Sequence, residues 1–136
     1  MDKVQLLKEL ILHTYVMLKP SAIHGIGIFA IRDIPLGCRN MFSETDEEWH
    51  SLNADEMKHL PSHVKNLIET YCLFDEEHYF VPAKGFKVMD LSLFLNHSDT
   101  PNIISINDGE FFETTRHIHA GEELFIDYGT IVESEE

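Results

Sequence analysis

The chain has 136 residues, of which 43% are hydrophobic, and it carries a formal net charge of −14. This length provides for one compact domain and is too short for two ordinary ones, and the hydrophobic content excludes global disorder. The negative charge makes nucleic acid a poor partner, because it repels the phosphate backbone. The same negative charge has two interpretations: it attracts basic partners, or it only keeps the protein soluble. The sequence leaves both open. We expect a single domain over residues 1–136.

No segment predicts membrane insertion or export. The longest apolar stretch near the start, residues 10–18, is too short to cross a bilayer, and no run resembles a signal peptide. We therefore expect a soluble intracellular protein, either cytoplasmic or nuclear. The two cysteines, Cys38 and Cys72, have no CxxC partner, which excludes a cysteine-type zinc site. Two reduced thiols are expected, although a disulfide between them is compatible with the sequence.

The first third of the chain passes from a helical to an extended pattern. Apolar residues at helical spacing predict an amphipathic helix over 2–13, which packs on the domain's own core or forms a dimer or partner surface. Residues 14–18 favour a strand that Lys19-Pro20-Ser21 ends, and residues 28–31 favour another. Gly25 and Gly27 predict a turn between these strands.

A helical insert is predicted at 53–73. Asn53 and Glu56 resemble a capping box before a helix over 54–60, which Pro61 interrupts. The clearest helix of the chain has apolar residues at i, i+3, i+4, i+7 and i+8, namely Val64, Leu67, Ile68, Tyr71 and Cys72.

The remainder reads as short strands and turns. Strands are expected over 79–81, 102–106, 110–116 and 123–128, with a hairpin turn at Asn107-Asp108-Gly109. The apolar run Leu91 to Leu95 suggests a buried strand that delivers the following polar residues to a pocket. A frayed acidic tail is expected from residue 130. Without βαβ alternation, the chain is predicted to be mostly β with a helical insert.

Each of three polar or glycine-containing segments has both a structural and a functional interpretation. Gly25-Ile26-Gly27 forms a plain turn or a loop that lets a ligand approach the backbone, and it lacks the third glycine and following helix of a dinucleotide site. Asn96-His97 begins either an ordinary turn or a binding site. Tyr128 is either a core aromatic or a hydrogen-bonding group in a cleft.

Together, and in this order, the three segments resemble the SET domain family. SET domains carry a GxG turn, an Asn-His-Ser-x-x-Pro-Asn stretch and a Gly-Glu-Glu-Leu-x-x-x-Tyr stretch. The corresponding segments here begin at Gly25, Asn96 and Gly121, and two Ile-x-x-Gly turns, at 34–37 and 118–121, also match. The resemblance covers about residues 16–129. It implies a β-clip of several small sheets with a C-terminal pseudoknot, which would bring Asn96-His97 beside Tyr128.

The resemblance also implies a function and assigns residues to it. Gly25, Ile26 and Gly27 would hold the methionine end of S-adenosylmethionine, and Asn96 and His97 its amino group and adenine region. Tyr128 would lie at the bottom of a lysine channel as a catalytic residue and would also adjoin the cofactor, while Tyr71 resembles a second channel tyrosine or fits the core. The implied activity is protein lysine N-methyltransfer, with a histone-like basic protein as substrate.

The chain also departs from the family pattern. Many SET enzymes have flanking zinc-binding cysteine clusters that help to close the site, and this chain has none, so we expect a homodimer to complete it. Ile126 occupies a place that is often aromatic, which leaves open whether mono-, di- or trimethylation results. The alternative function is a catalytically silent SET-like module that binds a basic peptide or protein.

The nine histidines do not predict a metal site. His59 and His63 are separated by Pro61, while His117 and His119 could share a strand face. Neither pair has an evident third ligand in the sequence. No metal is therefore expected.

Overall fold

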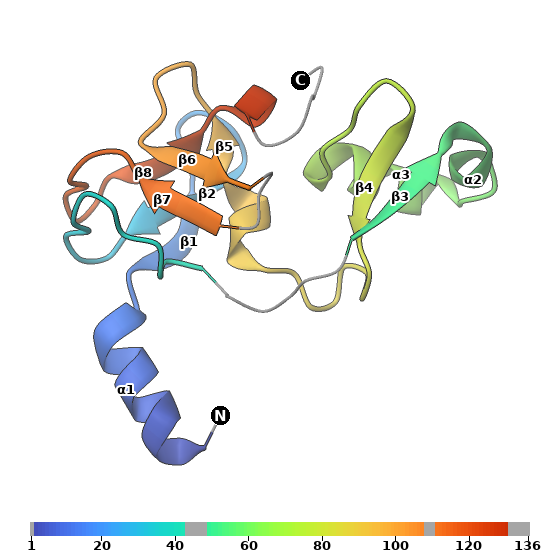
Figure 1. Ribbon diagram of the computed structural model, residues 1–136. Coiled ribbons are helices and arrows are strands. Elements are labelled where there is room, and N and C mark those ends of the chain that lie inside the picture. The colour runs from blue at the N-terminus through green and yellow to red at the C-terminus, as the bar shows by residue number, and fades with distance from the viewer. Residues whose placement is uncertain (1, 43–48, 108–110, 131–136) are drawn as a thin grey trace.

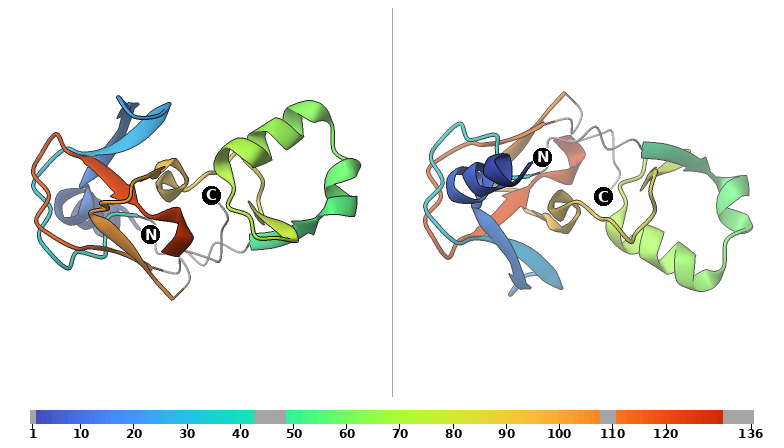
Figure 2. Two further views of the ribbon diagram at one scale, coloured as in Figure 1. Left: turned by 90° about the horizontal axis from the view of Figure 1, so that it is seen from above. Right: turned by 90° about the horizontal axis from the view of Figure 1, so that it is seen from below.

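The computed structural model describes residues 2–42, 49–107 and 111–130, which form a strand-rich body, a helical insert beside it and a projecting N-terminal helix (Figure 1). The insert stays to one side of the body when the molecule is viewed from above and from below (Figure 2). No helix in the described ranges has the length and apolarity needed to span a membrane.

Within the described residues, the strands form one four-stranded sheet and two two-stranded sheets. The four-stranded sheet has the order β1-β2-β8-β5, with β1 (Val16–Pro20), β2 (Ile26–Ala30), β8 (Glu123–Ile126) and β5 (Asn96–His97). Strand β8 pairs antiparallel with β2 and parallel with β5. The last strand in the sequence therefore lies inside the sheet, and the expected architecture of several small sheets with few helices is confirmed.

The two smaller sheets are antiparallel hairpins. In the body, β6 (Ile103–Ile106) pairs with β7 (Phe111–Thr114), and Asn107 after β6 has a left-handed φ of 55°. The rest of the predicted turn, residues 108–109, lies outside the described residues, as does the part of the predicted tail that follows residue 130. In the insert, β3 (Trp49–Asn53) pairs with β4 (His78–Pro82). The two helices α2 (Ala54–Lys58) and α3 (Ser62–Tyr71) lie between these strands in the sequence.

The core lies between the four-stranded sheet and the β6–β7 hairpin. Its fully buried side chains include Ile28, Ile34, Ile103, Ile118 and Leu124, each at 0% exposure. Burial of a side chain of this size stabilises a fold by about 1.5–3 kcal/mol relative to exposure. Both cysteines are buried as thiols, so the thiol interpretation is confirmed and the disulfide between them is not formed.

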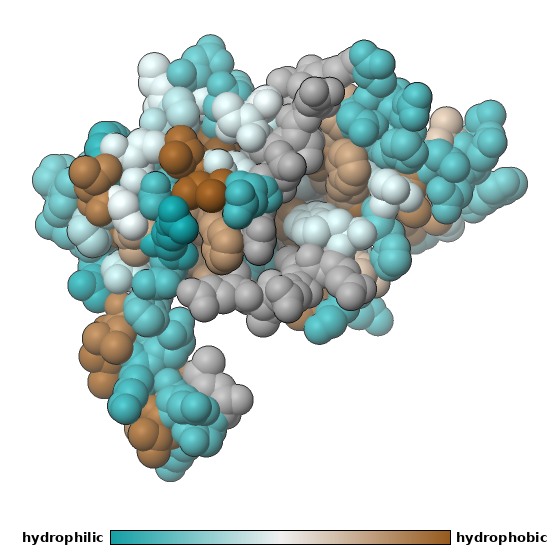
Figure 3. All heavy atoms as spheres, viewed as in Figure 1, coloured by the Kyte–Doolittle hydropathy of each residue, from teal (hydrophilic) through white to brown (hydrophobic). Residues whose placement is uncertain are grey.

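The N-terminal helix α1 (Lys3–His13) forms as predicted, but it does not pack on the core. Asp2 caps it through a capping box with Gln5, and none of its residues is buried. Its apolar side chains lie at the surface, including Leu7 at 51% and Ile11 at 73% exposure (Figure 3). Of the two interpretations of this helix, packing on the domain's own core is wrong.

Four other expectations differ from the structure. Strand β1 continues through Lys19 to Pro20, which an edge strand tolerates. The strand Trp49–Asn53 was not expected, because its sequence is polar and all five of its residues pair with the distant β4. Leu91 to Leu95 is not a strand, since Leu91–Phe94 form the 3-10 helix η1, which the Asp90 side chain caps. Strand β8 ends at Ile126, and Tyr128 begins a second 3-10 helix, η2 (Tyr128–Thr130).

Candidate functional site

A pocket of about 470 Å³ lies where the turn before β2, the η1–β5 segment, α3 and η2 meet. Six of the seven residues assigned from the sequence line it, namely Gly25, Ile26, Tyr71, Asn96, His97 and Tyr128. The seventh, Gly27, does not line the pocket. The other lining residues are largely apolar and include Ile23, Leu93, Phe94 and Leu95. This combination of an apolar wall with a few convergent polar groups is typical of small-molecule sites.

The two glycines have different roles, so the prediction of one turn holding both is wrong. Gly25 has a φ of +48°, its carbonyl accepts a hydrogen bond from the Ser21 N–H at 2.8 Å, and a Cβ there would meet nothing within 4 Å. Gly27 lies in β2 opposite Lys19. A Cβ on Gly27 would lie 2.3 Å from Glu123 Oε2, so the carboxylate would have to move away. Gly25 thus leaves room for a ligand, whereas Gly27 leaves room for Glu123.

The side chain of Asn96 holds the glycine-containing loop against the sheet. Asn96 is only 6% exposed, and its amide nitrogen donates to the His24 carbonyl and to Glu123 Oε2, both at 2.9 Å. Both partners are distant in sequence, so this amide joins three segments. A buried amide with these bonds fixes its neighbours, because breaking them would leave polar groups unsatisfied.

Glu123 is a site residue that the sequence analysis did not assign. It accepts the Asn96 bond on Oε2 and a hydroxyl hydrogen bond from Ser21 on Oε1 at 2.7 Å. The Ser21 Oγ in turn accepts the backbone N–H groups of Ile23 and His24. Glu123 belongs to the Gly-Glu-Glu-Leu segment, but the sequence gives no sign that it, rather than Glu122, faces the loop.

His97 and Tyr128 lie together, as expected. The backbone N–H of Tyr128 donates to His97 Nδ1 at 3.1 Å, and the two ring centroids are 5.3 Å apart. Because Nδ1 accepts this bond, the ring proton lies on Nε2, which is 3.2 Å from Asp99 Oδ1. The Tyr128 hydroxyl donates to the Leu95 carbonyl at 2.6 Å. The phenol is thereby fixed at the pocket wall.

Tyr71 reaches the same pocket from the last residue of α3. Its ring packs edge-on against Phe94, with centroids 5.4 Å apart. The insert thus supplies a second tyrosine to the pocket. Tyr71 and Phe94 form an aromatic wall, and both residues are distant from Tyr128 in the sequence.

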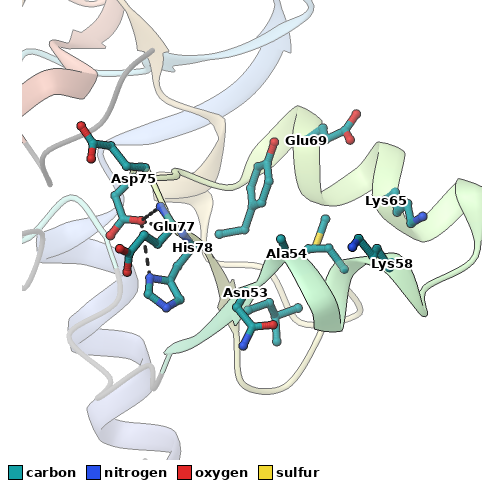
Figure 4. A pocket seen from close by; sticks show the side chains of 12 residues that line it. Asn53, Ala54, Lys58, Lys65, Glu69, Asp75, Glu77 and His78 are labelled. Carbon is teal, nitrogen blue, oxygen red and sulfur yellow. Dashed lines mark hydrogen bonds and ion pairs between the residues drawn. The ribbon is translucent and has the colours of Figure 1, made fainter.

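A second pocket, of about 400 Å³, lies within the insert (Figure 4). Its charged lining residues are Lys58, Lys65, Glu69, Asp75, Glu76 and Glu77. Helix α3 borders both pockets, since Glu69 lines this one and Thr70 and Tyr71 line the first. No sequence motif indicated this pocket.

The fold brings a third potential metal ligand, which the sequence did not indicate, beside His117 and His119. Asp33 joins them, and one ligand atom from each of the three residues lies within 4.8 Å of the others. Sequence spacing could not show this, because Asp33 and His117 are brought together only by the fold.

Known proteins share the fold of this chain. Residues 25–129 match the SET domain family. A Plasmodium falciparum protein provisionally described as a histone methyltransferase has a similar fold, with 18% identity, a TM-score of 0.52, and coverage of 87% of this chain and 96% of that chain. Comparison with curated protein sequences gives no match.

Two similar structures belong to a larger assembly. A humanized mutant of the Chaetomium thermophilum Polycomb Repressive Complex 2 matches with 28% identity and a TM-score of 0.54, over 86% of this chain and 15% of that chain. Apo ctPRC2 in an autoinhibited state matches with 26% identity and a TM-score of 0.57, over 86% and 16%. The present chain thus spans less than a fifth of those relatives.

The match over residues 25–129 covers most of the sequence, and the chain belongs to the SET domain family. Members of this family are generally protein lysine methyltransferases that use S-adenosylmethionine.

Proposed function

We propose that this protein transfers a methyl group from S-adenosylmethionine to a lysine side chain in a basic, histone-like protein. The observation that carries the proposal is the pocket of about 470 Å³, which gathers six of the seven residues assigned from the sequence. Its volume lies within the range of roughly 300–1,000 Å³ that is usual for small-ligand sites.

The residues present fit the cofactor. Gly25 leaves open space beside the pocket, so the methionine end could approach the backbone of Gly25 and Ile26 closely. Asn96 and His97 would contact the amino group and the adenine region. Gly27 would contribute indirectly, by admitting the Glu123 carboxylate that holds Asn96 in place. When bound, S-adenosylmethionine supplies a methyl group on a positively charged sulfur.

The remaining lining residues suit a lysine amine. Free lysine has a pKa of about 10.4 and must lose a proton before it can attack. The apolar side chains of Leu93, Phe94 and Leu95 disfavour the ammonium form, and so does a nearby sulfonium charge. Tyr128 would orient the amine, since a phenol that donates one hydrogen bond can also accept one. Tyr71 would border the channel, and most of the rate would come from positioning.

The charge of the chain supports a basic protein as substrate. The net charge is −14, and Glu69, Asp75, Glu76 and Glu77 lie around the insert pocket beside α3. Acidic surfaces speed the encounter with lysine-rich segments and repel nucleic acid.

Binding of S-adenosylmethionine is the most direct test. Isothermal titration and a thermal shift assay should both detect it in the wild type, and His97→Ala should bind more weakly. Methyl transfer to a panel of histones and ribosomal proteins then identifies the substrate class. If millimolar S-adenosylmethionine produces neither heat nor a thermal shift, the methyltransferase hypothesis is refuted. The alternative, a catalytically silent SET-like module that binds a basic partner, then remains.

We also propose that two copies of the chain associate through α1. An isolated helix of this length is marginal in water, so its stability depends on packing. Yet none of its 11 residues is buried, and Leu7 and Ile11 are more than half exposed. Light scattering should give the mass of a dimer for the wild type and of a monomer for Leu7→Glu/Ile11→Glu. A wild-type mass of one chain at micromolar concentration would contradict dimerisation.

A further inference from the structure

The two Ile-x-x-Gly turns of the sequence meet in space and present three metal-ligating side chains. Ile34 and Ile118 form an antiparallel bridge, with N–H···O distances of 2.8 and 2.9 Å in the two directions. Both isoleucine side chains are fully buried. Because neighbouring side chains on extended backbone point to opposite faces, Asp33, His117 and His119 point outward, and all three are exposed.

The spacing of these side chains suits a metal ion. His117 Nε2 lies 3.4 Å from Asp33 Oδ2, and the His117 and His119 ring centroids are 4.7 Å apart. Metal–ligand bonds of about 2.0–2.1 Å in a tetrahedral zinc site put ligand atoms roughly 3.4 Å from each other. The His117–Asp33 distance already matches this value. The three ligand atoms all lie within 4.8 Å of one another, so a small movement of the side chains would bring every pair to the distance that zinc requires.

Asp33 is held in position by a bond outside the cluster. Its Oδ1 accepts the Ala120 N–H at 2.9 Å, while Oδ2 faces His117. Such outer hydrogen bonds orient ligands in metal sites.

The neighbouring charges do not oppose a cation. Arg116 is 2.9 Å from Glu122 Oε2, so its charge is paired, and Glu122 Oε1 accepts the His119 N–H at 3.0 Å. The side chains of Asp33, Glu122 and Arg116 together carry one net negative charge at the cluster, which does not repel a cation.

We propose that Asp33, His117 and His119 bind a divalent transition metal, with Zn²⁺ as the best-fitting ion. Two imidazoles and one carboxylate are ligands that zinc accepts, and three protein ligands leave a fourth position for water or for a group from another molecule. The cluster shares no residue with either pocket. The metal would link the turn after β2 to the turn before β8 and so stabilise the pairing of these two strands.

Calorimetric titration of the full chain with ZnCl₂, after removal of metal by a chelator, tests the proposal. The wild type should bind one Zn²⁺ at this cluster, and Zn²⁺ should raise its Tm. His117→Ala/His119→Ala should bind at least tenfold more weakly and lose the shift in Tm. The control His59→Ala/His63→Ala removes two histidines elsewhere and should bind as the wild type does. Replacement of Zn²⁺ by Co²⁺ should give the visible absorption of a tetrahedral ion.

Asp33→Asn provides a second variant that preserves the turn. The amide oxygen of the introduced asparagine can still accept the Ala120 N–H, but it is a weaker metal ligand than a carboxylate, so the affinity should fall. The proposal is overturned if the wild type binds no Zn²⁺, if His117→Ala/His119→Ala binds as tightly as the wild type, or if Asp33→Asn does. None of these measurements depends on methyl transfer.

Discussion

At the scale of single residues, the candidate site depends on a chain of hydrogen bonds behind the pocket wall. Ser21 and Asn96 both donate to Glu123, at 2.7 and 2.9 Å, and Asn96 also donates to the carbonyl before Gly25. The carboxylate therefore positions the loop and the amide together. We infer that Glu123 is a positioning residue, since Asn96, which it holds, lines the pocket and Glu123 itself does not.

Replacement of Gly27 by alanine tests this arrangement. The new Cβ would lie 2.3 Å from Glu123 Oε2, so the carboxylate must swing away from Asn96 and Ser21. Loss of these bonds should cost about 1–3 kcal/mol in the free energy of unfolding and weaken cofactor binding. Chemical denaturation measures the first effect and calorimetry the second.

Two further variants complete that experiment. In Gly129→Ala the new Cβ would meet its nearest atom, Asp127 Oδ1, at an acceptable 3.4 Å, so little change is expected. If steric conflict with Glu123 is the cause, Gly27→Ala should cost much less in a Glu123→Ala background. Equal costs in the two backgrounds would show that the carboxylate is not responsible.

Tyr128→Phe should separate catalysis from cofactor binding. It removes the hydroxyl that donates to the Leu95 carbonyl at 2.6 Å but keeps the ring beside His97. We expect kcat to fall on the order of 10²-fold, the usual effect of misplacing a reactant, with a nearly unchanged cofactor Kd. Tyr15→Phe, at a buried tyrosine that does not line the pocket, is the control. Full activity in Tyr128→Phe would show that the assignment is wrong.

How far the sequence predicts the site depends on the range of the interactions involved. Asn96, His97 and Tyr128 were found because they stand in recognisable segments. Glu123 and Asp33 were not, because their partners lie 27 and 84 or more residues away and only the fold brings them close. The difference between Gly25 and Gly27 likewise depends on a carboxylate from another strand.

At the scale of elements, local signals were reliable and long-range pairing was not. The capping box of α2, in which Asn53 and Glu56 bond each other's backbone N–H groups, forms as predicted because all its atoms lie within one turn. Strand β3 was missed because its stability comes from β4, with Trp49 opposite Pro82. Leu91–Phe94 form a 3-10 helix in place of the expected strand because Asp90 caps the first turn.

The loop before β4 should give the insert a measurable acid sensitivity. Asp75 Oδ1 accepts the N–H groups of Glu77 and His78 at 2.8 and 2.6 Å (Figure 4). These bonds, the one from Glu77 first, hold the pKa of Asp75 below its usual 3.8. A lowered folded-state pKa gives stability that is complete above the unfolded-state pKa and is lost as the pH falls through the folded-state pKa.

Asp75→Asn should therefore flatten the pH dependence of stability. Between about pH 5 and about pH 3, the Tm of the wild type should fall more steeply than that of the variant, because asparagine has no charge to lose. Glu76→Gln removes a neighbouring carboxylate that accepts neither bond, and its Tm should follow the wild type. If Asp75→Asn and the wild type have the same slope, this carboxylate does not contribute.

At the scale of the whole molecule, net charge is the property that bears on the substrate. If acidic surface attracts a basic protein, the KM for that protein should rise as salt increases from about 50 mM to about 200 mM, because exposed charges are screened. The kcat should change little, since the proposed reaction would take place in the pocket. Steady-state kinetics at both salt concentrations checks this. A KM that is independent of salt would mean that charge only keeps the protein in solution.

The position of β8 inside the sheet also has a consequence for how the protein folds. β2 and β5 both pair with β8, yet they precede it by about 90 and 25 residues in the chain. Until β8 docks, both strands expose unpaired backbone groups, and the loop that closes each pairing is long. Chains dominated by such distant pairings fold slowly and are prone to aggregate on the way. The pocket is therefore complete only once β8 has docked between β2 and β5 and Tyr128 lies beside His97.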